Sequence, residues 1–152
     1  MMNRIKALLG AASAEESADP GERIQVATCV LLLEMAHADE TLHTLEAQLV
    51  GDLLSRRFDL PQKDVDELMA LADRERHQSH DLFQFAKEIN AHFSREEKLE
   101  IMDTLWRIIY ADGVLDKYED ALIRQLATLL RLTHREMIDA KVAVLDELNP
   151  GR

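Results

Sequence analysis

Three acidic side chains around one helix end are the residues of this sequence best suited to binding a metal ion. Asp112, Asp116 and Glu119 lie within eight positions, after one predicted helix and at the start of the next. Calcium and magnesium ions prefer clusters of oxygen ligands, which carboxylates supply. The spacing therefore indicates a site for a divalent metal ion at this corner between two helices.

A second acidic group lies 73 residues earlier in the chain. Asp39 and Glu46 form this group, and Glu40, His37 and His43 lie close to them in the sequence. Imidazole combined with carboxylate suits zinc or another transition metal better than calcium. The first half of the chain thus offers a second, chemically different candidate metal site.

The acidic residues of the second half also have a purely structural interpretation. Asp116 and Glu119 have the spacing of a capping box, which satisfies the first backbone N–H groups of a helix. Gly113 fits the left-handed position after a helix, and Asp112 can hydrogen-bond to the backbone of its own turn. An EF-hand loop needs about twelve residues, so the eight positions here exclude that motif. The sequence leaves both interpretations open, a metal site or a helix corner alone.

The remaining reactive side chains indicate structure rather than catalysis. Cys29 lies in an apolar run, where we expect a buried thiol. His77 and His80 fall in a polar stretch that we expect to link two helices. The aromatic side chains spaced as core residues are Trp106, Phe83, Phe85 and Phe93. Because the chain has no nucleophile elbow, glycine-rich phosphate loop or zinc-protease motif, we expect no enzyme.

The elements that position these residues are predicted to be helices throughout. Capping boxes at Ser94, Asp116 and Thr133 each precede an apolar run of helical period. No segment alternates with period two for long enough to predict a strand. Helices 20–38 and 94–111 are the most apolar and should lie at the centre of an all-α bundle. The full set of predicted helices is 2–10, 20–38, 43–57, 61–75, 80–93, 94–111, 116–131 and 133–148.

An internal repeat relates the two acidic groups. Residues 38–46 and 111–119 share the frame Ala-Asp-x-x-Leu-x-x-x-Glu at an offset of 73. The repeat predicts two related halves, about 1–75 and 76–148, within a single domain that spans 1–152. The simplest packing is a pseudo-two-fold arrangement in which the two long helices lie against each other.

Composition excludes several classes of partner. The chain has 152 residues, with 18 Lys and Arg against 29 Asp and Glu, for a net charge of −11. That charge opposes binding to nucleic acid or to an anionic membrane surface. One cysteine cannot form an internal disulfide, and no apolar run approaches the roughly 20 residues of a membrane span. We therefore expect a cytoplasmic protein with no nucleic-acid partner and no membrane insertion.

The sequence around the second acidic group resembles a known family. Residues 110–119, Tyr-Ala-Asp-Gly-Val-Leu-Asp-Lys-Tyr-Glu, are similar to the motif of the tellurite-resistance protein B-like (TerB-like) family, which is related to the N-terminal part of a DnaJ-type co-chaperone. The resemblance is best over 105–132 and weaker over 31–60. It implies an all-helical domain with an acidic metal site and a role in metal-ion or oxyanion stress. The first copy departs from the motif, with Glu40 for glycine and His43 for an acid.

Two functions follow as expectations from these observations. The first is a non-enzymatic helical domain that binds divalent metal ions through its acidic corners in a stress or tellurite-resistance context. The alternative is a protein-interaction or co-chaperone-like adaptor, in which the acidic motif only shapes the corner. In that case a groove beside the central helices would take a partner helix. The metal, the partner and the oligomeric state are left open.

Overall fold

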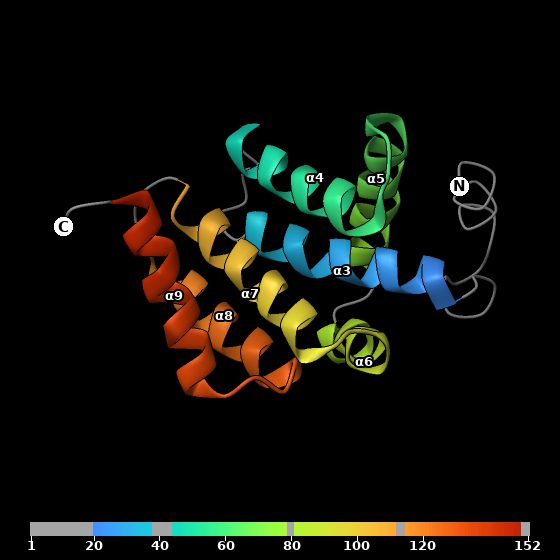
Figure 1. Cartoon of the computed structure of the whole chain (residues 1–152). Coiled ribbons are helices and arrows are strands. Elements are labelled where there is room, and N and C mark those ends of the chain that lie inside the picture. The colour runs from blue at the N-terminus through green and yellow to red at the C-terminus, as the bar shows by residue number, and fades with distance from the viewer. Residues whose placement is uncertain (1–19, 38–43, 79–80, 112–114, 150–152) are drawn as a thin grey trace.

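A computed structural model describes residues 20–37, 44–78, 81–111 and 115–149 of the chain (Figure 1). The described residues form helices joined by short turns and contain no strand, which confirms the predicted all-α class. The predicted helix at 2–10 lies outside the described residues. The helices are α3 (Pro20–Ala36), α4 (Thr44–Phe58), α5 (Gln62–Gln78), α6 (Leu82–His92), α7 (Arg95–Ile109), α8 (Lys117–Leu129) and α9 (His134–Leu148).

Helix α3 lies at the centre of the bundle, as its sequence predicts. It contacts α4, α5, α6, α7 and α8, which surround it on several sides (Figure 1). An ordinary surface helix buries one stripe, whereas α3 is buried around most of its circumference. The buried apolar residues of α3 are Ile24, Val26, Ala27, Cys29, Val30, Leu31, Leu32, Leu33, Met35 and Ala36.

Local chemistry fixes where the last three helices begin. Ser94, Asp116 and Thr133 each accept a hydrogen bond from the backbone three residues later, and the glutamate at that position bonds back to the cap. Each box satisfies two N–H groups that the helix itself leaves without a partner. All three capping boxes occur at the predicted residues.

The internal repeat is visible in the helix boundaries. Helices α3 and α7 end at Ala36 and Ile109, and the next helices begin at Thr44 and Lys117, so each pair of positions is 73 residues apart. The two long helices also contact each other.

The helices that follow the two long helices also end alike, at an offset of 72. Asp59 and Arg131 both have positive φ, of 53° and 60°. The amide of Leu60 donates to Ser55 O and that of Leu132 to Ala127 O, at 3.2 and 2.9 Å. This is the Schellman arrangement of a helix end. The one-residue difference from the offset of 73 shows that α4 and α8 differ by one residue before the same turn.

Helix α9 is attached to α7 by the single tryptophan. The Trp106 side chain is 1% exposed, and its Nε1 donates to the backbone oxygen of Met137 at 3.0 Å. The Tyr110 ring stacks on the indole at 6.0 Å between centroids, and the Lys141 ammonium lies 5.5 Å from the indole centroid. Trp106 therefore belongs to the core, as expected, and joins two helices of the second half.

Two sequence-based expectations need correction. Phe83 was expected in the core but is 57% exposed, because it lies in the first turn of α6, where the helix extends past its neighbours. His77 was expected in a linker but lies in the last turn of α5, which continues to Gln78. Cys29, in contrast, is fully buried as expected.

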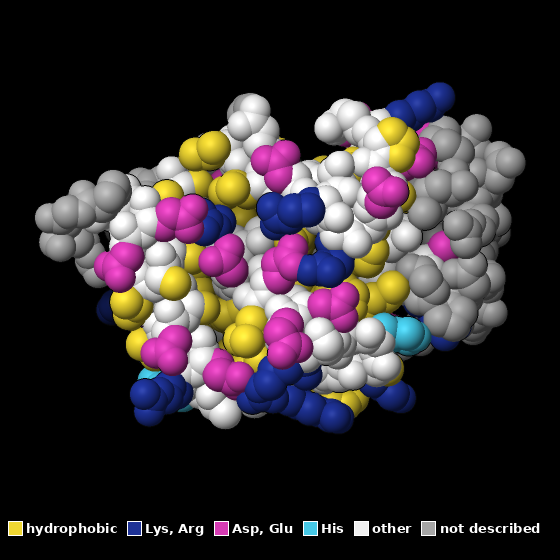
Figure 2. Space-filling model, in the orientation of Figure 1, with side chains coloured by type: hydrophobic (Ala, Val, Ile, Leu, Met, Phe, Trp, Pro, Cys, Tyr) yellow, Lys and Arg dark blue, Asp and Glu magenta, His cyan; other side chains and the backbone are white. Residues whose placement is uncertain are grey.

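The outer surface carries interspersed charges of both signs. Figure 2 shows acidic and basic side chains alternating over the face formed by α4, α7 and α9. Within the described residues no helix is long and apolar enough to cross a membrane.

Candidate functional site

The corner between α7 and α8 brings two of the predicted metal ligands together. Asp116 Oδ1 accepts the amide of Glu119 at 2.7 Å, and the amide of Asp116 donates to Glu119 Oε1 at 3.2 Å. The Glu119 side chain is 6% exposed, whereas Asp116 lies on the surface. The corner therefore holds two carboxylates in a fixed mutual geometry, in the first turn of a helix where the helix dipole favours negative charge.

The corner between α3 and α4 places an equivalent carboxylate in the first half. Glu46 lies in the first turn of α4 and is 4% exposed, which matches the position and burial of Glu119. Burying a carboxylate is costly unless polar groups compensate for the lost water. Finding it buried at both copies of one motif indicates that each corner supplies such groups.

Five residues were predicted as metal ligands, and the structure describes three of them. Asp116 and Glu119 meet at one corner and Glu46 lies at the other, while Asp39 and Asp112 lie outside the described residues. Among the described residues there is no group of three or more His, Cys, Asp or Glu side chains arranged to hold a metal ion. The donors at the second corner are carboxylate oxygens, which fit a hard cation such as calcium or magnesium.

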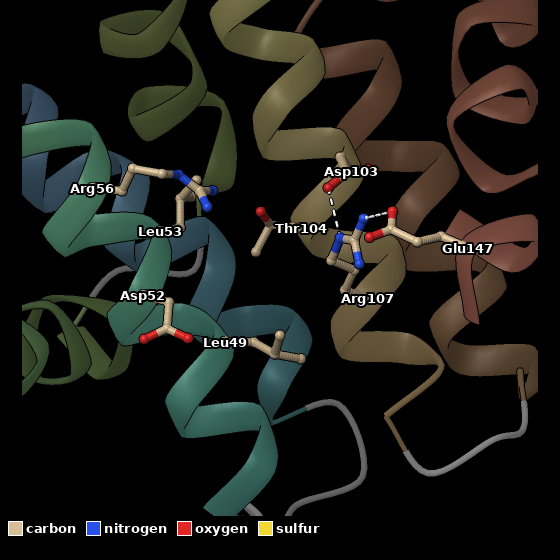
Figure 3. A pocket seen from close by; sticks show the side chains of 8 residues that line it. All are labelled: Leu49, Asp52, Leu53, Arg56, Asp103, Thr104, Arg107 and Glu147. Atoms are coloured by element: carbon tan, nitrogen blue, oxygen red, sulfur yellow. Dashed lines mark hydrogen bonds and ion pairs between the residues drawn. The ribbon is translucent and has the colours of Figure 1, made fainter. Parts of the chain in front are cut away.

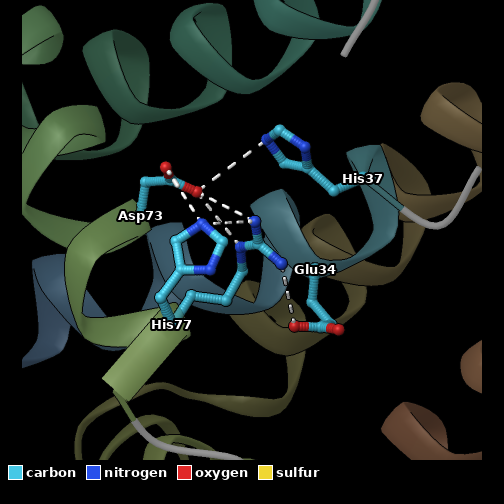
Figure 4. A network of polar contacts seen from close by, with 5 residues as sticks. Glu34, His37, Asp73 and His77 are labelled. Carbon is cyan, nitrogen blue, oxygen red and sulfur yellow. Dashed lines mark hydrogen bonds and ion pairs between the residues drawn. The ribbon is translucent and has the colours of Figure 1, made fainter. Parts of the chain in front are cut away.

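A charged network lies at the end of α3, next to the first corner (Figure 4). Asp73 of α5 is its hub, with Arg76 Nη2 at 3.0 Å, His77 Nε2 at 3.5 Å and His37 Nε2 at 3.9 Å. Arg76 reaches on to Glu34 of α3, at 3.7 Å. Burial lowers the pKa of His37, and the neighbouring Arg76 guanidinium lowers it further. The network thus joins α3 to α5 and favours a neutral His37.

A groove runs along the surface between α4, α7 and α9. Its polar end is a cavity of about 330 Å³, and a second hollow of about 210 Å³ shares Leu49 and Arg107 with it. We call the two together the α4–α7–α9 groove. Its polar end is lined by Leu49, Asp52, Leu53, Arg56, Asp103, Thr104, Arg107 and Glu147, and its apolar end by Leu45, Leu49, Arg107, Tyr110, Ala111 and Leu148 (Figure 3).

Both guanidinium groups of the groove are paired within the protein. Arg107 Nε bonds to Asp103 Oδ2 at 2.8 Å, and its Nη2 bonds to Glu147. Arg56 Nη2 bonds to Glu100 Oε1 at 3.2 Å. These pairs leave little positive charge available to an incoming anion.

Thr104 and Asp52 are different, because the described part of the chain offers neither side chain a hydrogen-bonding or ionic partner. A buried helical threonine commonly donates to the carbonyl four residues earlier, as Thr28 does to Ile24 O at 2.8 Å. Thr104 is 4% exposed yet makes no such bond, and its side chain points into the space between α4 and α7 (Figure 3).

The sequence gave little indication of this groove. Thr104 lies among the apolar residues of a buried helix, and Leu45 and Leu148 read as ordinary helical apolar positions. Leu45 is 51% and Leu148 48% exposed, which depends on how α4 and α9 diverge above α7. Only a threonine on the core face of α7 could have drawn attention to it.

The fold and its two acidic corners define an all-α domain built on an internal repeat, whose described residues hold no assembled catalytic group. The family model of tellurite resistance protein TerB matches residues 25–142, which include both corners and the helices from α3 to most of α9. The chain therefore belongs to the TerB family. Neither a curated protein nor a solved structure matches it.

Proposed function

We propose that this TerB domain is a non-enzymatic binding domain that takes up a divalent cation at the corner between α7 and α8. Asp112, Asp116 and Glu119 would supply the carboxylate oxygens, and the role would lie in a metal-ion or tellurite stress response. The carrying observation is the buried Glu119 carboxylate, held against Asp116 by two hydrogen bonds. Such prior ordering lowers the entropy cost of assembling a site.

A second site in the first half is part of the same proposal. Glu46 is buried at the position that matches Glu119, and Asp39 occupies the position that matches Asp112 in the sequence. The first copy lacks an acid at the position of Asp116, where it has His43. We expect this site to bind a hard cation more weakly than the second corner, because it has fewer carboxylates.

Calorimetry and thermal unfolding with Ca²⁺, Mg²⁺, Mn²⁺ and Zn²⁺ test the proposal. A cation present at a hundred times its dissociation constant stabilises the fold by about 2.7 kcal/mol. For a chain of this size that should raise Tm by roughly 5–10 °C. The variant carrying both Asp112→Asn and Glu119→Gln should lose the response, whereas Glu119→Gln keeps an amide oxygen for the Asp116 amide.

Glu96→Gln is the matched control for the metal experiment. Glu96 is exposed in the first turn of α7, at the end of that helix away from the corner. Its substitution removes one negative charge and should leave the metal response unchanged. No response of the unmodified protein to any of the four cations would remove the metal proposal.

A protein-interaction adaptor is the second candidate function, and the α4–α7–α9 groove is the observation that favours it. Exposed aliphatic side chains beside a polar cavity are typical of surfaces that bind another protein. Co-elution of one stoichiometric partner, lost on Leu148→Ser and kept on Phe83→Ser, would support this function. Phe83 is the control because it is equally exposed on α6, outside the groove.

A further inference from the structure

We infer that the α4–α7–α9 groove binds a basic amphipathic helix of a partner protein, with aliphatic side chains over Leu45 and Leu148 and a lysine or arginine at Asp52. The inference rests on the adaptor function and adds the chemical class of the partner. Three features of the groove carry it: its shape, its charge and the unpaired groups that it presents.

The shape favours a segment of chain over a compact small molecule. Two hollows lie next to each other and share Leu49 and Arg107, so the groove extends from the middle of α7 to its end. The apolar end is bordered by Leu45 of α4 and Leu148 of α9, both about half exposed. Aliphatic side chains on one face of a helix, spaced three or four residues apart, would cover these two leucines.

The charge of the groove selects a cationic partner. The polar end is lined by three carboxylates and two guanidinium groups, and both guanidinium groups already have carboxylate partners. Asp52 has no such partner among the described residues, and the whole chain carries a net charge of −11. Complementary charge steers association and excludes acidic competitors.

Thr104 is the second unpaired group and lies deeper than Asp52. A hydroxyl that is removed from water without a hydrogen bond is unfavourable. Its orientation into the cavity, instead of toward its own helix, places a donor and an acceptor where a partner side chain would enter (Figure 3). A lysine or arginine that passes Thr104 on its way to Asp52 would hydrogen-bond to both groups.

A phage-displayed library of helix-forming peptides of about 16 residues, or more than four helical turns, tests the inference. The library is selected against the full chain and counter-selected against the Leu148→Ser variant. We expect enriched sequences with lysine or arginine beside aliphatic residues at spacings of three and four. Enriched sequences that are acidic or uncharged would overturn the inference.

Titration of the enriched peptide with groove variants locates its binding site. Asp52→Asn should weaken binding about fivefold, as expected for loss of one partly exposed ion pair. Leu148→Ser should weaken it about tenfold, through loss of buried apolar area. Phe83→Ser and Glu96→Gln are the controls and should leave affinity unchanged, with circular dichroism confirming that every variant is folded.

The outcomes separate this inference from the functions proposed above. Peptides that bind equally well to the groove variants, but lose affinity on Phe83→Ser, would overturn the groove and leave the adaptor function standing. A library that yields no enriched peptide would overturn both. Peptide binding that is unchanged by EDTA would leave the metal proposal to its own titration. Concentration-dependent dimerisation abolished by Leu148→Ser would assign the groove to a second copy of the chain instead.

Discussion

Thr28 and Thr104 lie on the two long central helices and are both buried, yet replacing each with valine should have opposite effects on stability. Thr28 Oγ1 donates to Ile24 O at 2.8 Å, and the residue has no exposed surface. Thr28→Val removes that bond and should cost about 1 kcal/mol of unfolding free energy. Thr104 loses no bond within the described residues, so Thr104→Val should stabilise the protein.

The size of the gain at Thr104 follows from its surroundings. Burying a hydroxyl without a hydrogen bond costs about 1–3 kcal/mol in mutational data, and the cavity beside Thr104 relieves part of that cost. We therefore expect a gain of about 0.5 kcal/mol, again after. Valine and threonine have similar helix propensities, so the comparison is not confounded by the backbone.

Urea unfolding measures the difference between the two variants. Trp106 is the single tryptophan and is buried, so its fluorescence reports the transition. A difference of about 1.5 kcal/mol, with a slope of about 1–3 kcal/mol/M, separates the two midpoints by roughly 0.5–1.5 M. A loss of stability at Thr104 equal to that at Thr28 would refute the reasoning, because it would show that the Thr104 hydroxyl already has a partner.

Three further predictions concern side chains away from the groove. Trp106→Phe removes the hydrogen bond to Met137 O and leaves a cavity, so we expect a loss of about 2–3 kcal/mol by circular dichroism, and an unchanged midpoint would contradict this. Arg95 holds the pKa of Glu136 at about 2, against an ordinary 4.5, so Glu136 stabilises the fold above about pH 4.5 and that contribution is lost as pH falls toward 2. Stability of Glu136→Gln should fall less steeply over that range in urea titrations at several pH values. The pKa of His37 is lowered by burial, so the unfolded chain takes up a proton first and stability should decrease below about pH 6.5. His37→Gln should reduce that decrease, and equal slopes would count against the assigned surroundings of His37.

Helix boundaries could be predicted where local chemistry decides them. The capping boxes at Ser94, Asp116 and Thr133 need only residues three positions apart, so α7, α8 and α9 begin where the sequence predicts. The end of α5 was predicted three residues too early, because its last turn is polar. Polar side chains on an outer helix face do not end a helix, and the ion pairs of Asp73 hold this turn in place.

Exposure was predicted less well, because periodicity gives the direction of a side chain but not its depth. Phe83 points along the same face as Ala86, yet it lies beyond the neighbouring helices, whereas Ala86 is fully buried. The groove has the same origin, since the exposure of Leu45 and Leu148 depends on the separation of α4 and α9. At the acidic corners, the sequence predicted the capping geometry of Asp116 and Glu119, and their role as metal ligands stays a prediction.

The buried thiol of Cys29 makes this protein its own reporter of unfolding. Cys29 is the single cysteine, it has no exposed surface, and burial raises its pKa. A thiol reagent can reach it only when α3 leaves the centre of the bundle, so the labelling rate measures how often the domain opens. A cysteine introduced on the surface would react long before Cys29, so one dye can be attached at a chosen position without first removing a native thiol.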